Sequence, residues 1–323
     1  MKKRLMHILS LLLLATLVLS ACGSKAPVVA KPPLRVAWSL WPGYYPMAIA
    51  AEKGFFAKHG VEVEPVLYNV YSNQLPDLAS GMVDGAAIIL SDTLFDALSN
   101  SINVVMVLDH SAGADQVVAA PGINSPADLR GKRIGVQSTA VGGTLLIRRM
   151  LEQNNISISE VTLVSVAPEQ VPQAIPSQID AGYTYEPFSS QARAAGDKVI
   201  FSSADAPGVI VDVLTFRREV VQQRPEDVKA FIAAWQEALQ YWKDNPAEGN
   251  AIIAKATGMQ PEEISSEGVQ LFDLAANRQA YTQGTDATSL YFTTQTELDF
   301  LINTGDITNP VKISELLNPS FLQ

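Results

Sequence analysis

The sequence has little of several residue types on which large classes of function depend. It contains a single cysteine, so it has neither a disulfide framework nor a cysteine-based zinc site. It contains three histidines, and no cluster of histidines and carboxylates with metal-ligand spacing is visible. Charged residues make up only 17% of the chain, and acids outnumber bases to give a net charge of −10. Because nucleic-acid binding depends on clustered Lys and Arg, this balance argues against a nucleic-acid partner.

The one cysteine follows an N-terminal segment with the pattern of an export signal. Residues 2–4 are basic, residues 8–19 are mostly apolar, and small residues precede Cys22. The apolar run is too short to span a bilayer, and no later segment is long and apolar enough to do so. Leu-Ser-Ala-Cys resembles the bacterial lipobox, in which the cysteine thiol is lipidated. We therefore expect a signal peptide over 1–21 and a lipidated cysteine with a tether over 22–33. The mature chain is then expected on the extracytoplasmic face of the cell membrane.

From residue 34 onward, strand-like and helix-like stretches alternate along the chain. The expected strands are 34–38, 61–66, 85–90, 104–108, 116–119, 133–136, 161–164, 182–185, 198–201 and 209–216. The expected helices are 46–59, 73–80, 91–99, 125–129, 144–154, 168–174, 225–245, 247–257, 261–267 and 290–304. Strands separated by helices are typical of crossover units, which build mostly parallel sheets.

This alternation predicts an α/β protein with two lobes. The first lobe is expected to contain residues 34–116 together with 214–323, and the second lobe residues 117–213. Ligands of open α/β sheets bind beyond the carboxyl ends of the strands. Two such sheets that face each other therefore predict a ligand site in the cleft between the lobes.

Several stretches carry a resemblance to a known family. They are WPGYYP at 41–46 followed by AAEKGFF at 50–56, LRGKRIGV at 129–136, DAGYTYEPF at 180–188 and the helix that begins at Pro225. With these stretches the chain resembles the solute-binding proteins of ABC importers. The group it resembles includes binders of nitrate, taurine, alkanesulfonates, the pyrimidine precursor of thiamine, and riboflavin. The resemblance covers residues 34–323.

The resemblance implies a type II periplasmic-binding-protein fold, in which each lobe is a mostly parallel sheet flanked by helices. Such a protein captures a small solute between its lobes and delivers it to a membrane permease and its ATPase. It acts as a monomer without a cofactor, and it makes and breaks no bond.

The segments expected at the strand ends have a distinctive composition. They are 38–45, 68–75, 89–95, 109–115, 137–144, 183–188 and 208–212. They contain no Lys or Arg, five acids, and ten of the 24 aromatic residues in the chain. Sulfonate and nitrate favour a guanidinium partner, which these segments lack. Aromatic faces combined with carboxylates suit a flat heterocycle rich in hydrogen-bond donors, or a cation.

We therefore expect riboflavin as the first choice of ligand and the thiamine pyrimidine precursor as the second. Taurine, another alkanesulfonate or nitrate is the alternative within the same class, and it would be favoured if Arg35, Arg148 or Arg278 reached the cleft. A different class is a pyrimidine synthase of similar fold, which consumes its own histidine and a cofactor-bound lysine. A third class is a subunit that reports ligand to a membrane receptor.

Fifteen residues are the candidates for ligand contact. They are Trp38, Trp41, Tyr44, Tyr45, Tyr71, Asp92, Asp109, Ser138, Thr139, Gly142, Gly143, Thr144, Tyr185, Glu186 and Asp212. Glycines and hydroxyls at 137–144 let a backbone approach a ligand, although the stretch lacks the lysine of a P-loop and the spacing of a dinucleotide fingerprint. Other roles stay open for some candidates. Trp38 could pack in the core, Glu186 could belong to a turn, and Asp109 could cap a loop.

Overall fold

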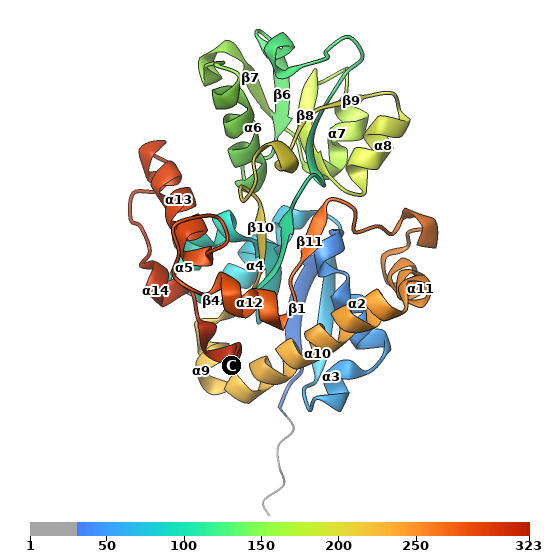
Figure 1. The fold of residues 1–323 in the computed structure, drawn as a ribbon, viewed down its shortest axis with the longest axis vertical. Helices are drawn as coiled ribbons and strands as arrows, with labels where there is room; N and C mark the ends of the chain where they lie inside the picture. The colour runs from blue at the N-terminus through green and yellow to red at the C-terminus, as the bar shows by residue number, and fades with distance from the viewer. Residues whose placement is uncertain (1–30) are drawn as a thin grey trace, which may run out of the picture. The chain divides into compact units, whose positions relative to one another are not determined.

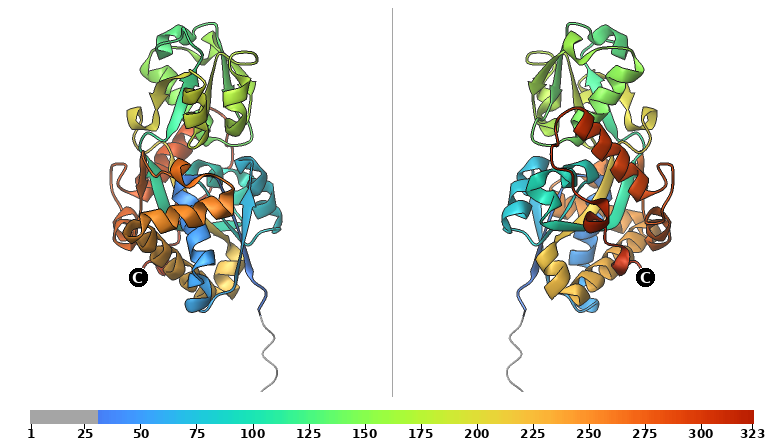
Figure 2. Two further views of the ribbon diagram at one scale, coloured as in Figure 1. Left: turned by 90° about the vertical axis from the view of Figure 1, so that its right-hand side faces the viewer. Right: turned by 90° about the vertical axis from the view of Figure 1, so that its left-hand side faces the viewer.

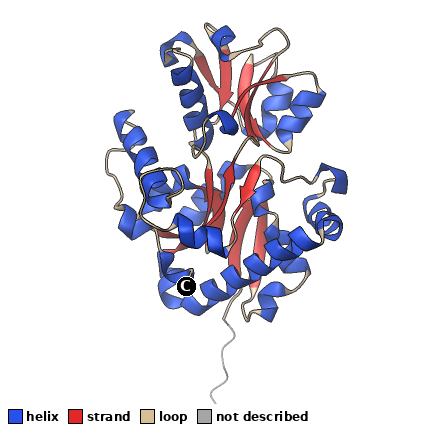
Figure 3. Cartoon of the chain, in the orientation of Figure 1, coloured by secondary structure: helices blue, strands red, loops and turns tan. Residues whose placement is uncertain are grey.

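The computed structural model describes residues 31–323, so the expected signal peptide, Cys22 and most of the tether lie outside the described residues. Residues 33–323 form one unit with its own core. It is built on two β-sheets, each flanked by helices (Figures 1 and 3). In the part of the chain that the structure describes, no helix is long and apolar enough to cross a membrane.

The first sheet has six strands in the order β11-β4-β10-β3-β1-β2. The strands are β1 (Leu34–Ser39), β2 (Val63–Tyr68), β3 (Gly85–Ile89), β4 (Ile102–Ser111), β10 (Val211–Arg217) and β11 (Val269–Leu271). β1 pairs with β2 and β3 in parallel, whereas β10 lies antiparallel between β3 and β4. The sheet is therefore mixed, because a strand from late in the chain is inserted into its centre.

The second sheet has five strands in the order β7-β6-β8-β5-β9. The strands are β5 (Asp115–Ala119), β6 (Arg133–Val136), β7 (Thr162–Ser165), β8 (Ala181–Tyr185) and β9 (Lys198–Ser202). β6, β7 and β8 are parallel, and β5 lies antiparallel between β8 and β9. Both sheets thus combine a parallel set with reversed strands, which are β10 and β11 in the first sheet and β5 in the second.

The helices cover the faces of the two sheets. Those of the first lobe are α2 (Pro46–Glu52), α3 (Phe55–Lys58), α4 (Gln74–Ser80), α5 (Asp96–Ser99), α9 (Arg218–Gln223), α10 (Pro225–Asp244), α11 (Pro246–Thr257), α12 (Leu274–Ala280), α13 (Leu290–Asn303) and α14 (Ile313–Leu316). Those of the second lobe are α6 (Gly142–Gln153), α7 (Val171–Ala174) and α8 (Phe188–Ala194). Short 3₁₀ turns are η2 (Pro42–Tyr44), η3 (Tyr71–Asn73), η4 (Leu90–Leu94), η5 (Pro126–Leu129), η6 (Ile158–Glu160), η7 (Pro168–Gln170), η8 (Ser203–Asp205), η9 (Pro261–Glu263) and η10 (Pro319–Phe321).

The chain passes between the two sheets at two crossing segments. Residues 112–114 join β4 to β5, and residues 203–210 join β9 to β10. The strand pairing thus places both crossings just before β5 and β10, whereas the sequence placed the lobe boundaries at 117 and 213. The two segments touch, because the Ser203 hydroxyl accepts the Gly113 N–H at 2.7 Å and is hydrogen-bonded to the Ser111 hydroxyl at 2.7 Å.

Helix α10 shows why the C-terminal part of the chain belongs to the first lobe. Its apolar residues recur every three or four positions and form one buried stripe, which includes Phe231 and Trp235. Phe231 stacks on Phe56 of α3 with ring centroids 5.0 Å apart. Figure 2 shows the same helix from two sides, packed on the lobe that contains β1. The expected two-lobed α/β fold is confirmed.

Five of the expected helices differ in the structure, since 125–129 forms only the 3₁₀ turn η5 and 168–174 is divided into η7 and α7. The helix expected over 46–59 is divided at Gly54, whose φ of 69° ends α2 and begins α3. The stretch 91–99 is divided by extended backbone at Phe95 into η4 and α5. The helix expected over 261–267 is only the single turn η9, and β11 follows it.

Candidate ligand-binding site

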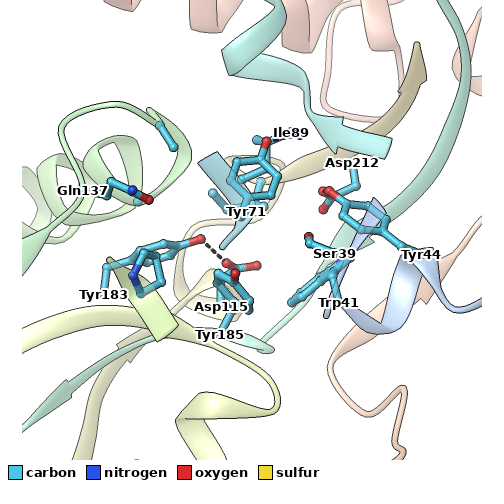
Figure 4. Close-up of a pocket in the computed structure, with 14 residues that line it drawn as sticks. Ser39, Trp41, Tyr44, Tyr71, Ile89, Asp115, Gln137, Tyr183, Tyr185 and Asp212 are labelled. Carbon is cyan, nitrogen blue, oxygen red and sulfur yellow. Dashed lines mark hydrogen bonds between the residues drawn. The ribbon is translucent and has the colours of Figure 1, made fainter. Parts of the chain in front are cut away.

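A small cavity lies where the two sheets face each other at the ends of their strands (Figure 4). Its volume is about 30 Å³. The first lobe contributes residues that follow β1, β2 and β3 and residues at the start of β10. The second lobe contributes residues at β5 and β8 and residues that follow β6 and β7. The lining residues are Ser39, Trp41, Tyr44, Tyr71, Ile89, Asp115, Gln137, Ala140, Gly143, Pro168, Tyr183, Tyr185, Ile210 and Asp212.

Trp41 is held in the cavity wall by a buried carboxylate. Its indole N–H donates to both oxygens of Asp109, at 3.2 and 3.1 Å. Across the lobes, the ring of Tyr185 meets the Trp41 ring edge to face, with centroids 5.9 Å apart. Asp109 thus lies behind Trp41 and fixes the angle of the indole, and the indole faces the cavity.

Asp212 lies beside Asp109, because β10 and β4 are paired at these two residues. The Tyr44 hydroxyl donates to one oxygen of Asp212. Burial, and next the neighbouring charge of Asp109, raise the pKa of Asp212 well above its usual range. Burial also raises the pKa of Asp109, although the Trp41 N–H opposes this effect. Two adjacent buried carboxyls cannot both ionise cheaply, so this pair retains a proton near neutral pH.

The second lobe supplies a matching set of tyrosines and acids. The Tyr183 hydroxyl donates to Asp115, whose pKa burial raises to about 6. The Tyr185 hydroxyl donates to Glu169 at 2.6 Å, and the same Glu169 oxygen accepts the backbone N–H of Tyr71 at 3.0 Å. Glu169 belongs to the second lobe and Tyr71 to the first, so this carboxylate joins the lobes.

Asp92 makes a second connection between the lobes. One of its oxygens accepts the Tyr71 hydroxyl at 2.7 Å, and the other accepts the backbone N–H of Val141, the residue before α6, at 2.7 Å. Burial raises the pKa of Asp92 to about 6, against the lowering effect of these two donors. Gln137 adds a third connection, because its side-chain amide donates to the Ser72 hydroxyl at 2.6 Å.

The polar atoms left without a partner in the cavity wall are mostly acceptors. One oxygen each of Asp115 and Gln137 is buried without a hydrogen-bond partner, and the second oxygen of Asp212 has no neighbour of that kind except the Asp109 carboxyl. Among the lining residues that the structure describes, none is Lys or Arg. The cavity therefore offers aromatic faces and free oxygens, and no fixed positive charge.

The three arginines that would have favoured an anionic ligand have other partners. Arg35 forms an ion pair with Asp84 at 3.1 Å, and Arg278 donates to the carbonyl of Leu322 at 2.7 Å. Arg148 lies 3.7 Å from Asp306. None of these arginines is among the described residues that line the cavity.

The structure brings six of the fifteen candidates to the cavity wall and places two behind it. Trp41, Tyr44, Tyr71, Gly143, Tyr185 and Asp212 line the cavity. Asp92 and Asp109 are buried just behind it as partners of Tyr71 and Trp41. Contact of these residues with a ligand stays a prediction.

The other seven candidates lie elsewhere. Trp38 is buried and faces a separate groove beside α2 and α11. Tyr45 and Glu186 line a wider cleft of about 820 Å³ next to 112–114, where Glu186 pairs with Arg193 at 3.0 Å. The remaining four belong to the loop and first turn of α6. Ser138 and Thr139 are exposed, Gly142 is buried without lining the cavity, and Thr144 is half-buried.

Glu169 is the main residue that the sequence reasoning missed. It follows Pro168 in a stretch that reads as an ordinary helix start, so nothing in the sequence marked it as part of the site. Asp115 and Tyr183 were visible in the acid and aromatic count of the strand ends but were left out of the fifteen. Their pairing across β5 and β8 was not visible in the sequence, because Asp115 lies opposite Tyr185 in register while its carboxyl meets Tyr183.

No group of three or more His, Cys, Asp or Glu among residues 31–323 is placed to hold a metal ion. The carboxyls around the cavity are partnered instead by tyrosine hydroxyls, the Trp41 indole and backbone N–H groups. Their chemistry is that of hydrogen-bond acceptance from donors of low charge.

The sequence is similar to known proteins over most of its length. The family model described as NMT1/THI5 like matches residues 41–249. A protein of Brucella abortus named as a binding protein is 29% identical over 230 residues, which cover 68% of this chain and 70% of that protein. A Haemophilus influenzae protein named for thiamine biosynthesis is 23% identical over 217 residues, covering 65% of this chain and 68% of that protein.

Solved structures share the fold at low sequence identity. The ligand-binding component of an ABC-type import system from Staphylococcus aureus has a TM-score of 0.73 at 15% identity, covering 90% of this chain and 98% of that one. The periplasmic aliphatic sulphonate binding protein of Escherichia coli has a TM-score of 0.72 at 16% identity, covering 90% and 94%. The desulfurization enzyme DSZB has a TM-score of 0.66 at 17% identity, covering 90% and 98%. Binding proteins and an enzyme thus share this fold, so the fold alone does not decide the function.

Proposed function

The chain belongs to the NMT1/THI5-like family, and from this premise we propose that it is the solute-binding component of an ABC importer. It captures a small nitrogen heterocycle between its lobes and delivers it to a permease and its ATPase. The relative from Brucella abortus, which is named as a binding protein, supports this role, as does the fold shared with binding components of import systems. The cavity between two lobes joined by two short crossing segments suits a protein that opens and closes around a solute.

The unpartnered oxygens of Asp115 and Gln137, together with the Asp212 carboxyl beside Asp109, carry the proposal for the ligand. A buried acceptor that lacks a partner is costly, so the solute that stabilises this wall most supplies N–H or O–H donors. The rings of Trp41 and Tyr185 add flat apolar faces for stacking. A sulfonate or nitrate would instead bring negative charge to a wall that carries carboxyls, and its affinity would suffer.

Among donor-rich heterocycles, the aminopyrimidine precursor of thiamine fits this wall better than riboflavin. An aminopyrimidine presents an amino group next to a ring nitrogen, and that nitrogen can take a proton from a carboxyl. The ring edge of riboflavin carries a single N–H donor between two carbonyl acceptors, and those carbonyls would face the free oxygens of the cavity. The order expected from the sequence, with riboflavin first, is therefore reversed in this proposal. A small organic cation is the third compound class that the same wall suits.

Uptake of any such solute requires the lobes to separate. The cavity of about 30 Å³ has the size of roughly one water molecule, whereas sites for organic ligands occupy roughly 300–1,000 Å³. The hydrogen bonds that must break on opening include those of Asp92 with Val141, Glu169 with Tyr71, and Gln137 with Ser72, and the Arg148–Asp306 ion pair also joins the lobes. In this proposal the protein is a monomer held at the extracytoplasmic membrane face through lipid on Cys22, which lies outside the described residues.

A ligand titration tests the proposal. The purified protein is titrated with 4-amino-5-hydroxymethyl-2-methylpyrimidine, riboflavin, taurine and nitrate, and tryptophan fluorescence is followed, since Trp41 lies in the wall. We expect saturable quenching by the aminopyrimidine. Asp212→Asn removes a buried carboxyl and should weaken binding at least tenfold, as expected for a charge-assisted hydrogen bond of roughly 1.5–3 kcal/mol. Asp244→Asn, at an exposed carboxylate at the end of α10, is the matched control and should change nothing.

Other results separate the parts of the proposal. Saturable binding of taurine or nitrate without binding of a heterocycle would overturn the ligand class and leave the transport role. Conversion of a heterocycle into a product by the purified protein would overturn the binding role itself. Equal binding by the protein and by Asp212→Asn would remove the cavity from consideration as the site.

A further inference from the structure

A second cavity, independent of the one described above, lies between α6 of the second lobe and α13 of the first. Its volume is about 290 Å³. One wall is α6 at Leu145, Arg149 and Gln153, and the floor is the crossing segment from 205 to 209. The other wall is α13, at Phe292, Thr293, Thr296, Glu297 and Phe300. We refer to this space as the α6–α13 groove.

Glu297 is an unusual residue to find in this wall. Its side chain is only 5% exposed, and neither carboxyl oxygen has a hydrogen-bond partner. Thr293 lies one turn earlier on the same face of α13, and its buried hydroxyl also lacks a partner. A buried carboxyl with two free oxygens costs stability, so its position calls for a partner that the chain itself does not supply.

The cations nearest to the groove do not fill this role. Arg149 lines the groove but pairs with Glu152 at 3.1 Å. Arg148 points to Asp306 at 3.7 Å. Burial, and next the charge of Asp92, raise the pKa of Glu297 well above its usual range, and no positive charge contributes to that pKa.

We propose that the α6–α13 groove is a second ligand site, for a small organic ammonium ion with an apolar body. The Glu297 oxygens and the Thr293 hydroxyl, which are buried beneath the groove surface, turn toward the bound ammonium group and accept its hydrogen bonds. The apolar body lies between Phe292, which is 38% exposed, and the aliphatic wall of Leu145 and Val209. A cation of this kind is favoured further by the ring face of Phe292, whereas the ring of Phe300 already lies under the Arg148 guanidinium, which is 5.8 Å from the ring centroid.

Because the groove lies between the two lobes, an amine bound in it would affect how the lobes are arranged. It would touch α6 of one lobe, α13 of the other and the crossing segment between them. A ligand that contacts both lobes at once favours the arrangement in which the two walls are close. Occupation of the groove would therefore favour the closed lobes.

Isothermal titration with three matched probes tests the site. The purified protein is titrated with 2-phenylethylammonium, 2-phenylethanol and phenylacetate, which share a ring and differ in the charge of the head group. We expect saturable one-site binding of the ammonium ion, at least tenfold weaker binding of the alcohol, and no binding of phenylacetate. Glu297→Gln should weaken ammonium binding at least tenfold. Asp299→Asn, at an exposed acid on the same helix, should leave it unchanged.

Two further variants locate the binding and guard against a folding artefact. Phe292→Ala changes an exposed ring and should weaken ammonium binding several-fold without a change in melting temperature. Asp212→Asn removes a carboxyl of the first cavity and should leave ammonium binding within twofold. The proposal is overturned if the ammonium ion does not bind saturably, if the three probes bind alike, or if Asp212→Asn weakens binding as much as Glu297→Gln does.

Discussion

At the scale of single residues, the site depends on how closely the backbone at Gly43 approaches a carboxylate. A methyl group added there would lie 1.6 Å from an oxygen of Asp109 and 2.8 Å from the indole nitrogen of Trp41. Such contacts cannot exist, so any larger residue must displace the Asp109–Trp41 hydrogen bonds. Only glycine fits at position 43 without steric clash. Gly43 lies in the turn η2, which follows Trp41 and helps to place it in the cavity wall.

We predict that Gly43→Ala lowers the affinity for the cavity ligand more than tenfold and destabilises the fold by about 1–3 kcal/mol. The physical reason is the forced movement of Trp41 and of the buried Asp109 carboxyl. The checks are the solute titration and urea denaturation. Gly54→Ala is the matched control, because Gly54 has open space around it and only its positive φ is at stake. Its cost should be about 1 kcal/mol, without loss of affinity. Unchanged affinity in Gly43→Ala would show that Trp41 does not contact the ligand.

A residue of the cavity wall could be predicted when its own type and its place in the sequence were enough to indicate a site. Trp41 and Tyr44 follow a strand in a short loop, and large aromatic residues there indicate a site. Trp38 was predicted to contact the ligand, but it does not line the cavity. Successive residues of a strand point to opposite faces, and the Trp38 side chain lies on the face that the helices cover. Glu169 was not predictable, because its role depends on the distance between two lobes that are far apart in sequence.

At the scale of elements, the stretch 91–99 shows how side chains override helix propensity. The sequence predicts one helix, but the side chains of Asp92 and Thr93 turn inward. Thr93 donates to the carbonyl of Leu90 at 2.6 Å, and Asp92 accepts hydrogen bonds from Tyr71 and Val141. These contacts hold a 3₁₀ turn, which extended backbone at Phe95 then ends. Local pattern could not predict this, because the partner Val141 belongs to the other lobe.

The start of helix α6 depends on the hydrogen bond from Val141 to Asp92. Its start has no side-chain cap of its own, and Asp92 accepts the Val141 N–H from across the cleft. A carboxylate at a helix N-terminus satisfies a free donor and interacts favourably with the helix dipole. The closed arrangement of the lobes therefore completes the start of α6.

We predict that Asp92→Ala loosens the start of α6 and favours the open lobes. Hydrogen exchange at residues 141–145 should accelerate at least tenfold, while the later turns of α6 keep their protection. The radius of gyration measured by X-ray scattering should increase. Asp128→Ala is the control, because Asp128 caps the short turn η5 within the second lobe and touches no residue of the first. Unchanged exchange at 141–145 in Asp92→Ala would contradict the role given to this contact.

At the scale of the whole molecule, the two lobes close on an unusually acidic interior. Asp92, Asp109, Asp115, Asp212 and Glu297 are all buried, and burial is the largest cause of the raised pKa of each. The sequence predicted the two-lobed fold and the excess of acids at the strand ends, and both are present. It did not predict Glu297, because a carboxyl in the middle of a helix ordinarily faces solvent.

This interior predicts that the folded protein is more stable at pH 6 than at pH 8. A carboxyl whose pKa is raised on folding contributes stability that is fully present below its unfolded value near 4 and is lost as the pH rises through the folded value. Asp92 and Asp115, with pKa values of about 6, change the free energy of unfolding with pH mainly below pH 6. In the same pH range, burial lowers the pKa of His110 to about 4. Its contribution to the free energy of unfolding therefore rises with pH and offsets much of the effect of the two acids.

Between pH 6 and 8 the pH dependence of stability is therefore set mainly by Asp109, whose pKa burial raises to about 8, and burial raises the pKa of Asp212 and of Glu297 in the same direction. Each proton that only the folded state retains changes the free energy of unfolding by about 1.4 kcal/mol per pH unit. We expect that free energy to fall by about 2–3 kcal/mol from pH 6 to pH 8 for the proton held at Asp109, measured by urea denaturation at constant ionic strength. Glu297→Gln should reduce this slope and raise stability at pH 8, whereas Glu226→Gln, at an exposed acid of α10, should leave both unchanged. A flat pH profile would mean that the buried carboxyls ionise in the folded protein as they do in the unfolded chain.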